Sequence, residues 1–199
     1  MSRNADTRTS SRTTPKTAPK GAHHASGHDV LDLLSEDHKN VRKMFDQFEK
    51  MKESEKADGE MKQSLIEHAC AELTIHAQVE EEIFYPAMRN AIDDMAMLDE
   101  AEVEHAAAKQ LITELSSMQP DDALYDAKFT VLGEYIKHHI DEEEKEMFKK
   151  ARKSDADLMT LADQVQHRKD ELREEMGISP MDEEGGKKAS RMTKGKQVH

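Results

Sequence analysis

The sequence predicts an all-α protein: an up-down-up-down four-helix bundle with an additional C-terminal helix and disordered tails. First, residues that favour helices, such as Ala, Glu, Lys, Leu and Met, are plentiful, whereas aromatic residues make up only 4% of the chain. Second, apolar residues recur at helical spacing throughout the interior of the sequence. Third, the links near 58–60, 91–97 and 119–121 are short, which favours antiparallel neighbours in a bundle.

The distribution of charge divides the chain. The 199 residues carry a net charge of −13, but residues 1–28 carry +4 and residues 177–199 carry +2, which leaves −19 on the interior. Both ends are rich in Ser, Thr, Gly, Pro and Lys and hold almost no large apolar residues, so we expect them to be disordered basic tails. We expect the bundle to occupy 29–153 and the appended helix 154–176.

Composition also excludes several classes of protein. No run approaches the roughly 18 apolar residues of a membrane span, and the N-terminal segment has no apolar core for secretion. One cysteine, Cys70, provides neither an internal disulfide nor a thiolate-rich zinc site. We therefore expect a cytoplasmic protein without membrane contact. The basic tails favour a solubilising or linking role, and contact with nucleic acid through them is the weaker alternative.

The elements follow from the apolar pattern, taken in chain order. Within the bundle, apolar residues repeat every three or four positions in four segments, and Pro120 marks the end of the third. A fifth segment stops before Gly177 and Pro180, a common signal for the end of a helix. The expected helices and their apolar residues are 30–51 (Leu34, Val41, Phe45, Phe48), 62–90 (Leu65, Ala69, Leu73, Ile83, Ala87), 98–118 (Leu98, Ala101, Ala108, Ile112, Leu115), 122–153 (Leu132, Ile136, Met147) and 155–176 (Leu158, Leu161, Val165, Leu172).

Ionisable residues interrupt the apolar face of every bundle helix. The second and fourth helices each place a histidine and a glutamate four residues apart, so both side chains project from the same face. A buried carboxylate without a partner is costly, and a cation would neutralise it while occupying the imidazole lone pairs. This pattern predicts a metal site. Its six candidate ligands are His38, His76, Glu80, His105, His139 and Glu143.

An internal repeat supports the same set. The stretch HAQVEEEIFYPAMR at 76–89 aligns without gaps on HIDEEEKEMFKKAR at 139–152, an offset of 63 residues. Asp37 precedes His38 as Glu104 precedes His105, so the domain consists of two similar helix pairs. Two such pairs facing each other would give a pseudo-two-fold site of four histidines and two glutamates.

Several assignments have alternatives. A single histidine on an apolar face is more often a hydrogen-bonded core residue than a ligand, and acidic runs are often solvated. A small rotation of the fourth helix would replace His139 and Glu143 by His138 and Glu142, but the repeat favours the former pair. The remaining residues of interest have simpler interpretations: Cys70 as a small buried hydrophobe, His68 as a surface residue, His167 as a structural or exposed residue, and His23, His24 and His28 as tail residues without a metal. Tyr85 and Tyr135 are interpreted as packing residues, with support of the metal ligands as the alternative.

Ligand type and number favour a dinuclear site. Imidazole and carboxylate without thiolate suit iron, manganese or zinc, and six ligands are too many for one tetrahedral zinc. If both glutamates bridge, each metal receives two nitrogens and two oxygens and keeps open positions, which suits dioxygen or its reduced forms. We therefore expect two iron ions per chain, with manganese and zinc as alternatives.

Four motifs resemble the ligand helices of the hemerythrin family, specifically the HHE cation-binding domain proteins: DHKNV at 37–41, HAQVEEEIFYP at 76–86, EHAAAK at 104–109 and HHIDEEEKEMF at 138–148. The resemblance covers roughly 29–152 and implies that the six candidates bind iron, with Glu80 and Glu143 bridging. Oxygen-carrying hemerythrins use a fifth histidine where this chain has Lys109, and an Asp five residues after the fourth-helix histidine, where this chain has Glu143 at four. Both departures weigh against reversible oxygen carriage.

Three functions follow from these observations. The first is a non-haem di-iron protein that binds or senses dioxygen, nitric oxide or reactive oxygen species such as peroxide, or that buffers iron. The second is a di-iron enzyme with catalase-like or ferroxidase activity, which the lysine in place of a ligand favours. The third is a metal-independent helical interaction module. We favour the first, because no general acid or base stands out beyond the ligands.

Overall fold

The computed structural model describes residues 27–53 and 59–178, and every element in these ranges is helical. The tails predicted at the two ends lie almost entirely outside the described residues. Two of the long bundle helices each contain one π-helical turn, labelled η1 and η2. In chain order the elements are α1 (Val30–Glu53), α2 (Gly59–Val79), η1 (Glu80–Phe84), α3 (Tyr85–Ala91), α4 (Met95–Ser116), α5 (Tyr125–Glu142), η2 (Glu143–Met147), α6 (Phe148–Ala151) and α7 (Leu158–Glu175).

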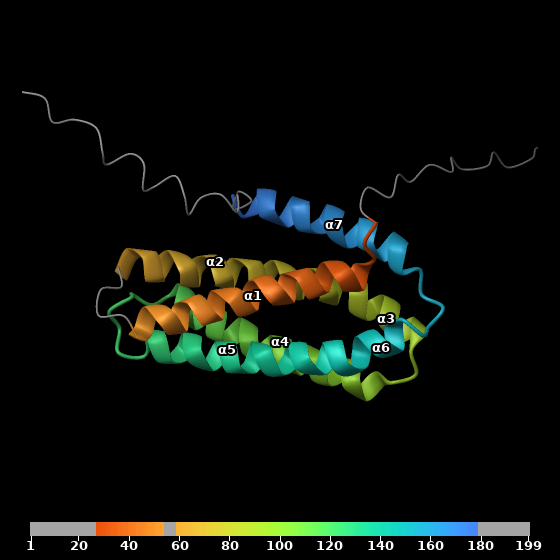
Figure 1. Ribbon diagram of the computed structural model, residues 1–199, viewed down its shortest axis with the longest axis horizontal. Helices are drawn as coiled ribbons and strands as arrows, with labels where there is room; N and C mark the ends of the chain where they lie inside the picture. Colours follow the sequence, from red (N-terminus) through yellow and green to blue (C-terminus); the bar gives the residue numbers. More distant parts are fainter. Residues whose placement is uncertain (1–26, 54–58, 179–199) are drawn as a thin grey trace, which may run out of the picture.

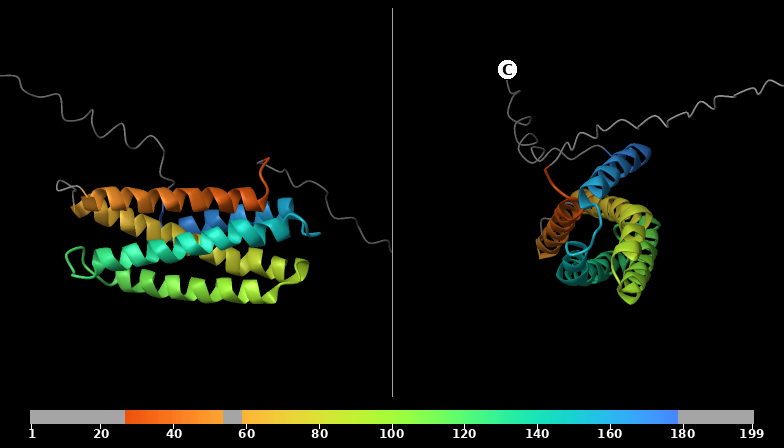
Figure 2. Two further views of the ribbon diagram at one scale, coloured as in Figure 1. Left: turned by 60° about the horizontal axis from the view of Figure 1, so that its bottom comes forward. Right: turned by 90° about the vertical axis from the view of Figure 1, so that its right-hand side faces the viewer.

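Four long helical rods form the predicted bundle, and α7 lies outside it (Figure 1). The rods are α1, then α2–η1–α3, then α4, then α5–η2–α6, and each runs antiparallel to the next in sequence. The end-on view in Figure 2 shows α7 against the side of the bundle formed by α1 and α2. The fold class is therefore the one that the sequence predicts, and the appended helix covers only one of the two helix pairs.

The helix ends differ from the predicted ones by a few residues. The side chain of Asp94 accepts a hydrogen bond from the backbone N–H of Met97 and starts α4 at residue 95, and Asp157 starts α7 in the same way through Thr160. Helix α7 ends before Gly177, whose φ of 65° lies in the left-handed region that favours glycine. None of the described helices is long and apolar enough to cross a membrane.

The π-turn η1 corrects one predicted helix face. We expected Ile83 and Ala87 to continue the buried face of the second helix, but both are only half-buried. Phe84 and Met88 take their place and are fully buried. A π-turn spans one more residue than an α-turn, so every side chain beyond it moves by one position around the helix. The prediction was wrong here because it continued the α-helical period through Glu80.

Two apolar clusters fill the bundle, one toward each end. One cluster lies at the end that α7 covers, and it includes Leu31, Phe84 and Val165. The other lies at the opposite end and includes Phe45 and Phe129. In α1, Leu34 belongs to the first cluster and Val41 to the second, with His38 between them, and the same change of cluster occurs around His105 in α4. The core thus leaves a polar layer at mid-bundle.

Candidate metal centre

The structure brings all six predicted ligand side chains into this mid-bundle layer. Each is buried, with at most 6% of its surface exposed. Their nitrogen and oxygen atoms form two overlapping groups that share one glutamate, and within each group the atoms lie within 4.8 Å of one another. The first group holds His38, His76, Glu80 and Glu143, and the second holds Glu80, His105 and His139.

Each glutamate contacts one histidine of its own helix and one from the other helix pair. The Oε2 atom of Glu80 lies 3.2 Å from Nε2 of His76, four residues earlier on the same rod, and 3.4 Å from Nε2 of His105 on α4. The arrangement repeats in the second pair, where Oε2 of Glu143 lies 3.5 Å from Nε2 of His139 and 3.4 Å from Nε2 of His38. Both π-turns begin at these glutamates. The sequence repeat is thus a repeat in space.

A ring of four outer carboxylates orients the imidazoles. His76 Nδ1 lies 3.4 Å from an oxygen of Asp37, and His139 Nδ1 lies 2.8 Å from one of Glu104, both within a helix pair. Across the pairs, Glu81 and Glu144 lie 3.0 Å from Nδ1 of His105 and His38. In a neutral imidazole, an Nδ1–H group that donates to its carboxylate leaves Nε2 with a lone pair toward the centre, so these contacts favour the tautomer that a metal ligand needs.

The ligand-orienting role of Glu81 and Glu144 was not predicted from the sequence. Each directly follows a predicted glutamate ligand within an acidic run, 80–82 or 141–144. Residues adjacent in a helix point about 100° apart, so the acid that follows each ligand reaches a neighbouring helix instead of the shared centre. The signal was present in the repeat, because residues 80–81 align on 143–144 under the 63-residue offset.

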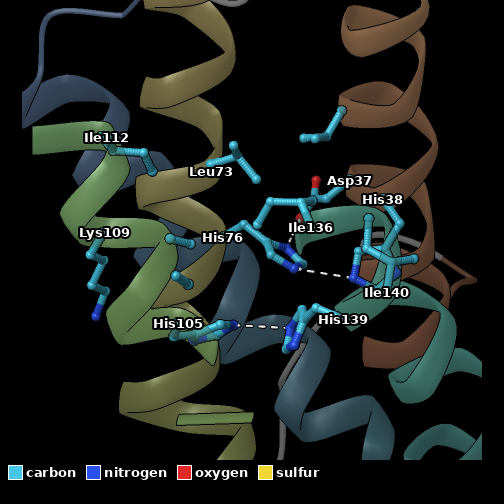
Figure 3. A pocket seen from close by; sticks show the side chains of 13 residues that line it. Asp37, His38, Leu73, His76, His105, Lys109, Ile112, Ile136, His139 and Ile140 are labelled. Carbon is cyan, nitrogen blue, oxygen red and sulfur yellow. Dashed lines mark hydrogen bonds and ion pairs between the residues drawn. The ribbon is translucent and has the colours of Figure 1, made fainter. Parts of the chain in front are cut away.

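The donor atoms of the cluster fit cations. Nε2 of His38 lies 3.1 Å from Nε2 of His76, and the same distance separates Nε2 of His105 and His139 (Figure 3). Both carboxylate oxygens of Glu80, together with Oε2 of Glu143, are buried and accept no hydrogen bond. Lone pairs that face each other and buried carboxylates without donors are costly, and metal ions satisfy both at once. Imidazole and carboxylate donors without thiolate suit iron, manganese or zinc.

The pKa shifts indicate how the metal-free chain balances the buried charges of the cluster. Burial would lower the pKa of His38, but the neighbouring carboxylates of Glu143 and Glu144 raise it to about 9. Burial likewise opposes the charged form of His139, whereas the charge of Glu143 and a hydrogen bond to Glu104 raise its pKa to about 9. Burial would raise the pKa of Glu143, and the two histidines hold it far below its usual range instead. Without metal, protons therefore occupy the cluster, and a metal ion must displace them.

An aromatic ring packs on one histidine of each pair, and one of these rings carries a hydroxyl. Tyr85 lies against His105, and its hydroxyl donates to Oε1 of Glu143 at 3.0 Å. Phe148, at the equivalent position of the repeat, stacks on His38 with 5.7 Å between the ring centroids. We interpreted Tyr85 mainly as a packing residue, and the structure adds a polar contact within the cluster. Tyr135 is 51% exposed and therefore does not belong to the buried cluster.

A small cavity of about 20 Å³ adjoins the four imidazoles (Figure 3). Most of its lining is aliphatic, including Leu73, Ile136 and Ile140. Lys109 lies at its edge, and its ammonium extends away from the histidines to an ion pair with Glu81. The cavity has room for about one molecule the size of water, and its walls offer little hydrogen bonding to water.

The remaining polar candidates lie away from the cluster. His138 is 65% exposed in its side chain, and with Glu142 and Glu104 it forms a group at the surface. The 63-residue repeat thus identified the inward-facing pair, His139 and Glu143. His167 and His28 are exposed, and His23 and His24 lie outside the described residues. Cys70 is buried, and burial raises the pKa of its thiol to about 12, in keeping with a structural residue.

Comparison with known proteins extends the sequence resemblance. The profile of the hemerythrin HHE cation binding domain matches residues 29–151 of the chain. A solved structure, that of a hemerythrin HHE cation binding domain-containing protein from Mycobacterium kansasii, is similar in fold with a TM-score of 0.61. It is 21% identical in sequence, and the match covers 74% of this chain and 89% of that chain. No curated protein shows significant similarity to the chain.

Proposed function

Because the chain belongs to the hemerythrin HHE cation-binding family, we propose that its buried cluster binds two iron ions. The orientation of the imidazoles carries the proposal: every Nδ1 faces a carboxylate, so every Nε2 is free to bind a metal at the shared centre. Each glutamate contacts a histidine of both helix pairs and can therefore serve both ions. The proposed ligands are His38, His76, Glu80, His105, His139 and Glu143.

The surroundings of the cluster favour a small ligand without charge. Bound iron would supply open coordination positions and redox chemistry toward dioxygen, nitric oxide or peroxide. The chain limits what arrives there, because the adjoining cavity holds about one water-sized molecule and has mostly aliphatic walls. We propose that the protein binds or senses one of these molecules.

The side chains near the cluster favour binding over turnover. Rapid turnover of peroxide would need a group that exchanges protons with the substrate and with solvent. The hydroxyl of Tyr85 is buried, and burial together with the charge of Glu143 raises its pKa well above the ordinary value, so it keeps its proton. Lys109 and Lys169 pair with the outer carboxylates Glu81 and Asp37 rather than with the cluster.

Metal content tests the proposed centre. The chain is loaded with ferrous iron under anaerobic conditions, and bound iron is measured per chain together with the absorption spectrum after oxygenation. We expect two irons per chain and an oxo-bridge charge-transfer band. A double substitution, His76→Ala with Glu80→Ala, should remove most of the iron. The matched control is His138→Ala with Glu142→Ala, which removes another His and Glu four residues apart, at the surface. One metal ion or none in the unsubstituted chain, or equal iron in the two variants, would contradict the proposal.

Ligand exposure separates binding from catalysis. The iron-loaded chain is exposed to dioxygen, nitric oxide or peroxide, and the spectrum is followed before and after degassing. A spectral change that reverses on degassing supports binding. Many rapid turnovers of peroxide per chain, or sustained oxidation of added ferrous iron, would replace the binding proposal by an enzymatic one.

A further inference from the structure

A buried lysine connects the appended helix to the proposed metal centre. Lys169 lies in α7 and is only 5% exposed, which is rare for lysine unless the charge is paired. Its ammonium Nζ lies 2.5 Å from Oδ1 of Asp37 on α1. The other oxygen of Asp37 faces Nδ1 of His76, whose Nε2 points into the cluster. One ion pair and one hydrogen bond thus link α7 to a proposed ligand.

This link differs from those of the other three outer carboxylates. The side chain of Asp37 is 11% exposed, whereas those of Glu81, Glu104 and Glu144 are 30%, 24% and 37% exposed. Water therefore reaches the other three more easily and can share in solvating their charge. The charge of Asp37 depends on a neighbouring cation, and Lys169 supplies it from outside the matched domain, which ends at residue 151.

We propose that Lys169 is a positioning residue of the metal centre, which holds the side chain of Asp37 in place against His76 and thereby fixes the tautomer and orientation of that imidazole. A buried carboxylate without a neighbouring cation is costly, so Asp37 turns toward water when the ammonium is removed. That movement takes away the acceptor of the Nδ1 proton, so Nε2 of His76 is no longer held as a lone pair toward the cluster. Outer partners of metal-bound histidines commonly change metal affinity by about 10- to 100-fold.

The proposal makes α7 part of the site and not only a cover. It rests on the proposed function, because it requires a metal at His76. The helix is held by other ion pairs as well, such as that between Arg168 and Glu82 on η1, where Nε of Arg168 and Oε2 of Glu82 lie 2.8 Å apart. The pair between Arg168 and Glu82 reaches no ligand, so it offers a matched control on the neighbouring residue of the same helix.

The experiment compares Lys169→Met with Arg168→Met in the full chain. Metal affinity is measured by titration with Co²⁺ in competition with a chelator, and the absorption bands of bound Co²⁺ are recorded. We expect Lys169→Met to lower the affinity for at least one Co²⁺ ion by about 10- to 100-fold and to shift the absorption bands of that ion. Arg168→Met should leave affinity within about twofold and the spectrum unchanged, and Lys169→Arg should restore part of the affinity. Equal affinity and identical bands in Lys169→Met and the unsubstituted chain would overturn the proposal.

A second measurement does not depend on how the variant folds. Nitrogen-15 NMR of the histidines in the unsubstituted, zinc-loaded chain reports which ring nitrogen of His76 carries the proton. We expect the Nδ1–H form, and a proton on Nε2 or a mixture of forms would overturn the proposal. Failure of the unsubstituted chain to bind any metal would instead reject the proposed function, so the two failures are distinguishable.

Discussion

The two helix pairs of the bundle have the same inner residues but different outer surroundings. In the first pair, α1 with α2–η1–α3, Asp37 supports His76 and is itself paired with the buried Lys169. In the second pair, α4 with α5–η2–α6, Glu104 supports His139 and lies 3.8 Å from the 65% exposed His138. The difference arises because α7 packs mainly on the first pair.

This comparison shows which features the repeat determines. The residues that face the centre recur at a fixed offset because both pairs must present the same donors to one cluster. The outer carboxylates need only supply an acceptor for Nδ1 of a histidine. The positive charge that balances each carboxylate comes from the segment that packs against it. The two helix pairs are therefore alike in the residues that face the centre and differ in the residues that pack farther from it.

The largest expected difference between the pairs is in the free energy of unfolding that is lost when the equivalent acids Asp37 and Glu104 are each replaced by their amides. Asp37→Asn keeps an oxygen that can accept from His76 but leaves Lys169 buried without a counter-charge. Removing one partner of a buried ion pair typically costs about 3–5 kcal/mol. Glu104→Gln keeps the acceptor for His139, whose charge Glu143 still balances, and the other partner of Glu104, His138, is exposed, so its cost should be clearly smaller than that of Asp37→Asn. Urea denaturation of the metal-free chains measures both values.

Equal losses of stability in Asp37→Asn and Glu104→Gln would contradict this difference, because they would show that α7 does not distinguish the helix pairs. A control is Asp37→Asn combined with Lys169→Met, which removes both charges. This double variant should recover much of the stability lost in Asp37→Asn alone, since replacing both partners of a buried pair costs less than removing one.

The same contrast explains what could be predicted from sequence. The bundle followed from helical periodicity, and the six inward residues followed from their phase with Leu34, Leu73, Leu98 and Leu132 on the four helices. These features are local, because they depend on the spacing along one helix. The position of α7 against the first pair depends on contacts between distant segments, and no pattern within the helix indicates its neighbour.

Two details were not predicted from the sequence, for different reasons. The π-turn at Glu80 moved the buried face from Ile83 to Phe84. The extra residue of a π-turn cannot be recognised from the sequence where several neighbouring residues are apolar, because more than one of them could continue the buried face. Lys169, by contrast, did leave a mark: it lies in phase with the buried Val165 and Leu172. The phase argument that identified the histidines applies to this lysine too, but we expected only apolar residues on that face.

A smaller difference between the pairs lies at Tyr85 and its counterpart Phe148. Replacing Tyr85 by Phe makes the two pairs alike and removes the hydroxyl that donates to Glu143. The carboxylate oxygen then stays buried without a donor, which should lower the free energy of unfolding of the metal-free chain by about 1–3 kcal/mol. The exposed Tyr135→Phe is the matched control and should change stability by less than about 0.5 kcal/mol. A cost no larger than that of the control would show that the hydroxyl does not distinguish the pairs.

The smallest expected effect comes from Gly133, which stands at the position of the 63-residue repeat that Cys70 occupies in the first pair. A Cβ atom on Gly133 would lie 2.8 Å from Cδ1 of Phe45 on α1, too close for a real contact. The ring of Phe45 packs on Phe129 at 5.0 Å between centroids, so it has little room to move away. Overpacking a core costs about 1–3 kcal/mol, while Ala in place of Gly stabilises a helix by about 1 kcal/mol.

We therefore expect Gly133→Ala to lower the free energy of unfolding by up to about 2 kcal/mol in urea denaturation. Adding Phe45→Leu tests the cause, because it removes the atoms that the new Cβ meets. In that background the same Gly133→Ala change should cost less than it does alone, and it becomes favourable if the gain in helix propensity outweighs the remaining contacts. An equal cost in both backgrounds would mean that the ring of Phe45 does not set the approach of α1 and α5.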